Sequence, residues 1–313
     1  MSRSITLSTL SAVTLKGEFF GCGEREAILR VVCLHGWMDN AASFDLFIPH
    51  LLRSFSPSVC VLALDLAGHG KSSHEPGGNY TVTSYASSVL EALDTLVWDS
   101  RLVLVGHSMG GGVATIIAGA FPERMSGLVL LDSAGPPVRS PTEAPDNFSK
   151  SVAFKAVVAR KPGGSVYPTM EDGVKARMTT VASHPPNKFG PQCISEACAR
   201  ALVERCMVPT SAGEQKGWTW TFDPRIKVSS SITLGEDAIL EYLRRVAACI
   251  PALLLRARNG WPYSEALLVP RLAALAPTVE ELPGYHHFHR DPDTAAAVGE
   301  RVCNWLRKQG LAP

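Results

Sequence analysis

The chain has 313 residues, of which 46% are hydrophobic and 19% are charged, and its formal net charge is +1. This length fits one large α/β domain or a core with an inserted subdomain, and the composition is that of a folded globular enzyme. The balanced charge, without a long basic run, argues against nucleic acid as a partner, and no apolar run approaches the length of an integral membrane segment.

Eight cysteines are present, and none belongs to a C-x-x-C pair. Cys193, Cys198 and Cys206 cluster loosely, without further ligands at a spacing that suits a metal ion. We therefore expect no metal site and no cofactor. Cysteine usage of this kind favours a reduced, cytoplasmic protein.

The first 16 residues allow two interpretations. Ser and Thr are frequent here and no acidic residue precedes Glu18, which gives a weak similarity to an organelle-targeting peptide. The run from Ser11 to Phe20 is rich in β-forming residues and alternates in part, which predicts a strand. We favour the strand.

Two buried strands are predicted next, at residues 28–34 and 59–66, each followed by a loop that contains glycine. After the first strand, we expect His35 to be structural and the backbone N–H of Trp37 to face a ligand. The Trp37 ring is also a candidate wall of a substrate pocket. After the second strand, we expect Asp65 and His69 to fix a turn.

The most informative segment is Gly106-His-Ser-Met-Gly110, which lies between an apolar run at 102–105 and a run of small residues at 112–118. A strand, a tight turn and a helix in this order predict a nucleophile elbow that exposes the hydroxyl of Ser108. The backbone N–H of Met109 is then a candidate oxyanion donor together with that of Trp37. His107 is a candidate pocket residue.

Strands and helices alternate through this half of the chain. An amphipathic helix is predicted at 82–96 and a further buried strand at 126–132. This alternation predicts a mostly parallel, doubly wound sheet, in which ligands bind beyond the carboxyl ends of the strands. Ser108 and Asp132 both fall at such ends.

The pattern changes after a proline-rich exit from the sheet. Residues 136–249 contain helical stretches and one aromatic extended segment at 217–225, so we predict a helical cap inserted into the core. Trp218 and Trp220 line the pocket or fill the small core of the cap, two interpretations that we weigh equally. Strands at 251–256 and 277–282 and a final amphipathic helix complete a core formed by 1–135 and 250–313.

Four sequence blocks carry a resemblance, namely LHGWMDNAASF at 34–44, DLAGHG at 65–70, GHSMGG at 106–111 and PGYH at 283–286. They resemble the α/β-hydrolase fold superfamily. The first block and the segment Asp223-Pro-Arg225 resemble, more narrowly, the serine hydrolase-like proteins. The resemblance covers nearly the whole chain and is weak in the cap. It implies an eight-stranded core, a cap between strands six and seven, and ester-type hydrolysis by a Ser–acid–His triad.

The triad is assigned residue by residue. Ser108 needs a base, and the family pattern of a histidine after Pro-Gly favours His286, with His287 as the alternative. Many relatives carry the acid in the loop after strand seven. Here that loop has no Asp or Glu, and the amide of Asn259 lacks the negative charge that stabilises a histidine cation. We therefore favour Asp132 at the end of strand six, with Glu265 as a more distant candidate.

Three functions compete. The first is a cofactor-free serine hydrolase that acts on a small carboxylic ester or related acyl compound, as a monomer or homodimer. The second is a hydrolase that cleaves carbon–carbon bonds with the same Ser108–Asp132–His286 triad. The third is a non-catalytic relative that keeps the pocket to bind a small molecule. The retained serine, histidine and backbone donors favour the first.

Overall fold

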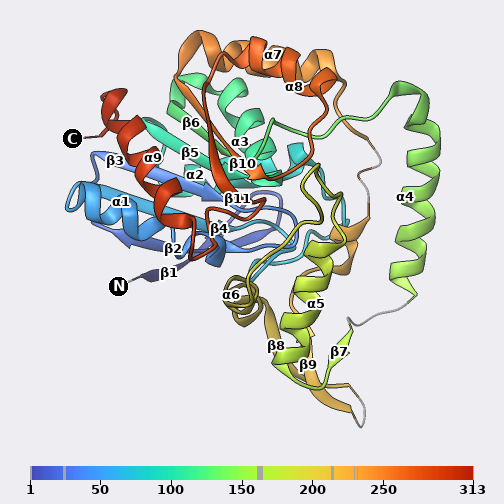
Figure 1. The fold of residues 1–313 in the computed structure, drawn as a ribbon. Coiled ribbons are helices and arrows are strands. Elements are labelled where there is room, and N and C mark those ends of the chain that lie inside the picture. The colour runs from blue at the N-terminus through green and yellow to red at the C-terminus, as the bar shows by residue number, and fades with distance from the viewer. Residues whose placement is uncertain are drawn as a thin grey trace.

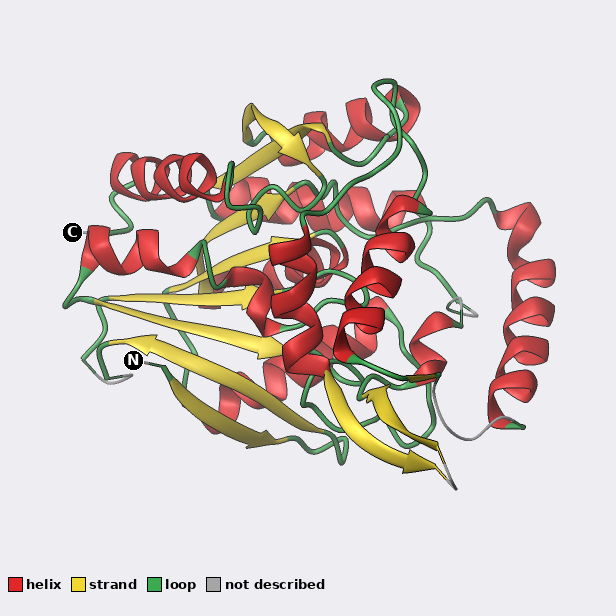
Figure 2. Cartoon of the chain, turned by 60° about the horizontal axis from the view of Figure 1, so that its bottom comes forward, coloured by secondary structure: helices red, strands yellow, loops and turns green. Residues whose placement is uncertain are grey.

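A computed structural model describes residues 2–23, 26–160, 165–212, 215–228, 230 and 232–312. Within these residues, eight strands form one sheet in the order β1-β2-β4-β3-β5-β6-β10-β11, with helices on both faces (Figures 1 and 2). Only β2 runs antiparallel to its neighbours within that sheet. The strands are β1 (Arg3–Ser8), β2 (Thr14–Gly21), β3 (Leu29–Leu34), β4 (Val59–Asp65), β5 (Leu102–His107), β6 (Met125–Leu131), β10 (Ala252–Asn259) and β11 (Thr278–Tyr285).

The central strands are apolar over nearly their whole length because both faces of the sheet are covered. Along β3, Val32 and Leu34 join the apolar cluster on one face, whereas Val31 and Cys33 join the cluster on the other. This alternation follows from the two-residue period of a strand. The sheet is thus the middle layer between two hydrophobic cores.

Four helices contribute to the first core, and two contribute to the second. Helix α3 is buried along almost its whole length and packs against α2, α7 and the sheet. Such close packing requires its small residues. The helices of the first core are α2 (Val82–Thr95), α3 (Met109–Ala120), α7 (Glu236–Cys249) and α8 (Glu265–Leu275), and those of the second are α1 (Ile48–Phe55) and α9 (Ala295–Lys308).

The chain leaves the sheet after β6 and returns to it at β10, which are the sixth and seventh strands of the large sheet in chain order. The excursion carries its own apolar cluster and extends beyond the edge of the core (Figure 1). Its elements before α7 are α4 (Ala144–Ala159), β7 (Val166–Tyr167), α5 (Met170–Ala182), α6 (Glu196–Cys206), β8 (Met207–Ala212) and β9 (Gln215–Trp220).

The excursion contains more strand than the helical cap with one extended segment that the sequence predicts. Strands β7, β9 and β8 form a small antiparallel sheet, of which the sequence indicated only the aromatic strand. Helix α7 lies inside the predicted cap range 136–249, yet its buried face packs on α3 in the core. The domain limits stay a prediction, and we use the term cap for 141–228.

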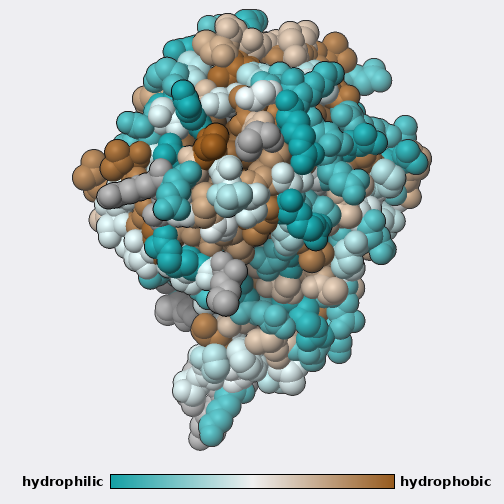
Figure 3. Space-filling view, turned by 90° about the vertical axis from the view of Figure 1, so that its left-hand side faces the viewer, coloured by the Kyte–Doolittle hydropathy of each residue, from teal (hydrophilic) through white to brown (hydrophobic). Residues whose placement is uncertain are grey.

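The molecular surface shown in Figure 3 is largely hydrophilic, with hydrophobic residues in separate groups. In the described part of the chain, no helix combines the length and apolar character needed to cross a membrane. All eight cysteines lie within the described ranges and carry free thiols.

Candidate active site

The predicted elbow is present between β5 and α3. Ser108 has φ +52° and ψ −118°, a strained conformation that places it between the last residue of the strand and the first of the helix. A Cβ atom on Gly106 would lie 2.5 Å from the carbonyl oxygen of Gly110, and one on Gly110 would lie 2.1 Å from that of Leu34. The two glycines therefore allow the backbone segments around Ser108 to touch.

The side chains of Ser108, His286 and Asp132 form a continuous hydrogen-bonded chain. His286 Nδ1 lies 2.6 Å from Asp132 Oδ2, and His286 Nε2 lies 2.9 Å from Ser108 Oγ. The carboxylate oxygen accepts, so Nδ1 carries the proton, and Nε2 then presents its lone pair to the serine hydroxyl. The hydrogen bond predicted between Asp132 and His286 is confirmed.

Asp132 is held by β10 and by the loop that follows it. Its Oδ1 accepts from the N–H of Ala257 in β10 at 3.1 Å, and its Oδ2 accepts from the N–H of Trp261 in the loop at 2.7 Å. A Cβ atom on Gly260 would lie 2.3 Å from Oδ2, so this position requires glycine. The strand and its loop therefore supply the N–H donors that orient the Asp132 carboxylate.

The alternatives to this set lie elsewhere. His287 turns away from Ser108, and its Nε2 lies 3.3 Å from Asp39. Asn259 ends β10 and Glu265 begins α8. Within the described residues, Asp132 is the carboxylate that contacts His286.

The two predicted oxyanion donors follow neighbouring strands of the sheet. Trp37 comes after β3, and Met109 begins α3 directly after β5, the strand that pairs with β3. The Trp37 ring is turned toward the cap, where its Nε1–H donates to the carbonyl of Ile226 at 3.0 Å. The role of both backbone N–H groups in binding an oxyanion stays a prediction.

The sequence makes His107 a candidate pocket residue. In the structure its side chain is fully buried and lines no open surface. Its Nε2 lies 2.9 Å from the carbonyl oxygen of His286, and its ring centroid lies 4.7 Å from that of His286. His107 therefore contacts the backbone of the candidate base. It ends β5 on the same side as Val103 and Val105, which lie in the second core, and this explains why its ring is buried.

The aromatic residues around His286 are not the pair named from the sequence. Trp261 and His286 have ring centroids 5.3 Å apart, and His184 of the cap contacts the rings of Trp261 and Trp37. Trp218 and Trp220 instead pack on the apolar cluster of the cap. For these two residues, the structure favours the second interpretation, a place in the small core of the cap.

Two supporting residues escape sequence analysis. Gln192 of the cap is buried, accepts from the backbone N–H of His286 at 3.3 Å and donates to the carbonyl of Gly260 at 3.0 Å. The Tyr263 hydroxyl lies 3.4 Å from the carbonyl oxygen of Asp132. Neither residue stands in a local motif, so only the folded chain reveals these contacts.

The structural roles expected for His35, Asp65 and His69 are confirmed. His35 Nδ1 donates to the carbonyl of Gly36, and its Nε2 accepts from the N–H of Leu66. Asp65 accepts from the N–H groups of Ala41 and Lys71, and His69 contacts the carbonyl of Ala67. These bonds fix the loops beside Ser108.

Comparison with known proteins identifies the family of the chain. Residues 30–161 match the alpha/beta hydrolase fold family. A serine hydrolase-like protein of Danio rerio is 29% identical over 306 residues, which cover 94% of this chain and 86% of that protein. A serine hydrolase-like protein of Mus musculus is 45% identical over 104 residues, which cover 33% of this chain and 32% of that protein.

Solved structures extend the similarity to the full length. The hypothetical protein PA1622 of Pseudomonas aeruginosa superposes with a TM-score of 0.82 at 30% identity, over 98% of this chain and 99% of that one. The thioesterase domain from the curacin biosynthetic pathway superposes with a TM-score of 0.78 at 21% identity, over 97% and 99%. The chain belongs to the α/β-hydrolase fold superfamily, and within it the chain resembles the serine hydrolase-like proteins.

Proposed function

We propose that the protein is a cofactor-free serine hydrolase that cleaves a small carboxylic ester or related acyl compound. Ser108 acts as the nucleophile, His286 as the general base and then acid, and Asp132 as the carboxylate that orients the imidazole. The observation that carries the proposal is the unbroken chain of hydrogen bonds from Asp132 Oδ2 through His286 to Ser108 Oγ, at 2.6 and 2.9 Å.

The first half of the reaction forms an acyl-enzyme. Ser108 Oγ attacks the carbonyl carbon of the substrate while its proton passes to His286 Nε2, and the Asp132 carboxylate stabilises the imidazolium. The N–H groups of Trp37 and Met109 donate to the negatively charged oxygen of the tetrahedral intermediate. The carbon–oxygen bond of the leaving group then breaks, and His286 returns the proton to the departing alcohol.

The second half releases the acid. A water molecule gives a proton to His286 Nε2 as its oxygen attacks the acyl carbon. The second tetrahedral intermediate expels Ser108 Oγ, which takes the proton back from His286. The carboxylic acid departs, and the hydrogen-bonded chain is restored.

A fluorophosphonate probe tests the proposal directly, because it labels only an activated serine. We expect stoichiometric labelling of the folded protein and loss of the label in Ser108→Ala. The matched control is Ser133→Ala, because Ser133 follows the acid and donates to the Ser108 carbonyl at 2.8 Å, outside the proposed proton path. Ser133→Ala should still be labelled.

Turnover of p-nitrophenyl esters of increasing chain length then defines the acyl group. Labelling without turnover of any ester would redirect the search to carbon–carbon bonds, which the same triad can cleave. Folded protein without labelling at Ser108 would overturn the catalytic proposal and favour a binding role.

A further inference from the structure

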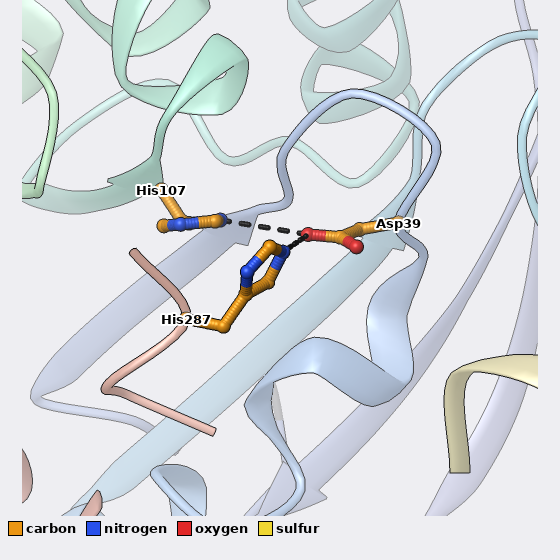
Figure 4. A group of neighbouring side chains, drawn as sticks. All are labelled: Asp39, His107 and His287. Atoms are coloured by element: carbon orange, nitrogen blue, oxygen red, sulfur yellow. Dashed lines mark ion pairs between the residues drawn. The ribbon is translucent and has the colours of Figure 1, made fainter. Parts of the chain in front are cut away.

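A second group of polar side chains lies behind the triad, in the interior of the protein. Asp39 lies in the loop after β3, His107 ends β5, and His287 lies in the loop after β11, so the three come from distant parts of the chain. All three are buried. Asp39 Oδ2 lies 3.5 Å from His107 Nδ1 and 3.3 Å from His287 Nε2, and the ligand atoms of the group all lie within 4.8 Å of one another (Figure 4).

The hydrogen bonding of His107 leaves an unsatisfied contact. Its Nε2 faces the carbonyl oxygen of His286, which can only accept, so Nε2 carries the proton. Nδ1 of the neutral ring is then a bare lone pair that faces the carboxylate of Asp39. Within the described residues, His107 Nδ1 and Asp39 Oδ2 complete no hydrogen bond. Two acceptors that face each other in the protein interior repel each other unless a donor or a positive charge lies between them.

The nearest positive charge contacts the other oxygen of the carboxylate. Arg177 donates to Asp39 Oδ1, whereas the two imidazole nitrogens face Oδ2. A carboxylate oxygen beside two imidazole nitrogens is a set of atoms that binds a metal ion.

The spacing of the three atoms also suits an ion. A tetrahedral zinc site with bonds of roughly 2.0–2.1 Å separates its ligand atoms by roughly 3.3 Å, close to the two contacts of Asp39 Oδ2. Gly36 keeps the space open, because a Cβ atom there would lie 2.9 Å from His107 Nδ1 and 3.0 Å from Asp39 Oδ2.

We propose that Asp39 Oδ2, His107 Nδ1 and His287 Nε2 bind one divalent transition-metal ion of the zinc class. Two imidazoles and a carboxylate favour such an ion over Mg²⁺ or Ca²⁺, which prefer oxygen ligands. The hydrogen bond from His107 Nε2 to the His286 carbonyl fixes the required tautomer, and Arg177 binds Asp39 and orients the carboxylate. The positive charge of Arg177 opposes the ion and limits its affinity.

The ion would lie next to the candidate base. His107 supports the His286 carbonyl, and His287 is the next residue in the chain. Metal occupancy therefore bears on the position of His286 and offers a means of regulating hydrolysis. This proposal does not depend on the reaction that Ser108 performs, because the ligands are separate from the Ser108–His286–Asp132 chain.

Calorimetric titration with Zn²⁺ after chelation tests the site. Cys193 and Cys249 are exposed, and thiolates are zinc ligands, so the protein is studied as Cys193→Ser/Cys249→Ser to remove binding at the surface. We expect one equivalent of bound Zn²⁺ and a loss of affinity of at least about tenfold in His287→Gln. The matched control is His184→Gln, because His184 is a neighbouring histidine that is not a proposed ligand. This variant should bind Zn²⁺ with the affinity of the parent protein.

Electron paramagnetic resonance of bound Cu²⁺ gives an independent readout, because the spectrum of the protein without any ligand substitution already reports the coordinating nitrogens. We expect hyperfine coupling to two imidazole nitrogens, reduced to one in His287→Gln if that variant folds, as judged by thermal unfolding in chelator. Failure of the folded protein to bind one equivalent of Zn²⁺, equal affinity in His287→Gln and His184→Gln, or a copper spectrum without two nitrogens would each overturn the proposal.

Discussion

Ser108 and Asp132 both adopt positive φ, at +52° and +46°. Each such residue costs roughly 1–3 kcal/mol and persists only where its surroundings dictate the conformation. At Ser108 the contacts of Gly106 and Gly110 do so, and at Asp132 two backbone N–H donors do so. The strain therefore coincides with the two positions whose side chains must meet His286 from opposite sides.

The carboxylate of Asp132 is expected to matter through its charge. Asp132→Asn keeps the shape and removes the negative charge that stabilises the His286 imidazolium, so kcat for ester hydrolysis should fall by roughly 10⁴. Steady-state kinetics with p-nitrophenyl acetate measure the change. Asn259→Asp is the matched control, and it should leave kcat near wild type because Asp132 already contacts His286. An Asp132→Asn protein with normal kcat would contradict the assignment.

At this scale, the sequence predicted the residues that stand in motifs. Ser108 was evident from the elbow, and Asp132 from its place at a strand end. Gln192 was missed because its contact depends on how the cap folds back on the sheet, and Trp261 because a loop residue beside His286 belongs to no motif. The Asp39–His107–His287 group was missed because its residues are separated by 68 and 180 positions, a spacing that no local metal pattern covers.

Helices α3 and α7 approach each other closely through their backbones. A Cβ atom on Gly119 would lie 2.7 Å from the carbonyl oxygen of Tyr242 and 2.9 Å from its Cα. Backbone atoms cannot move aside as the end of a flexible side chain can, so a larger side chain here would push α3 and α7 apart. Gly119→Val should therefore lower the free energy of unfolding by roughly 1–3 kcal/mol.

Urea unfolding of Gly119→Val measures this loss. Gly235→Ser is the matched control. Gly235 precedes α7, its Cβ position has no heavy atom of the described residues within 4 Å apart from its chain neighbours, and serine is favourable before a helix. Equal losses in the two variants would show that the α3–α7 contact is not the cause.

The elements were predicted in proportion to the strength of their patterns. Strands β3 to β6 and β10 are continuous apolar runs, and α2 has clear periodicity, so each was found within a few residues of its limits. Strand β7 has two residues, β8 contains Pro209 and α8 contains Pro270, so none of these matched a simple pattern. Tertiary contacts, not local preference, decide such segments.

Across the whole molecule, Asp223 joins the cap to the core. Its carboxylate accepts from Arg225 and from the Tyr80 hydroxyl at 2.6 Å, and its N–H donates to the Gly68 carbonyl at 2.8 Å. Burial would raise the pKa of Asp223, but the hydrogen bonds from Arg225 and Tyr80 lower it below its ordinary value. The shape of this junction thus depends on the ionised carboxylate.

The lowered pKa of Asp223 predicts a pH dependence. The ionised carboxylate contributes stability above its unfolded pKa of about 3.9, and that contribution is lost as the pH falls through the lower folded pKa. Asp223→Asn should therefore be less stable than wild type at pH 6, and the difference should shrink toward pH 3. Urea unfolding across this range measures it, and a difference that stays constant with pH would refute the assignment to this charge.

The cap also forms hydrogen bonds with the loop that follows β3. The amide of Asn40 donates to the Leu202 carbonyl at 2.8 Å, and Arg177 binds the neighbouring Asp39. That loop contains Trp37, whose ring is bonded to the cap as well. A large movement of the cap would break these hydrogen bonds. If the proposed hydrolase activity holds, we expect substrate to enter through small movements of side chains, which would limit the size of the molecule admitted.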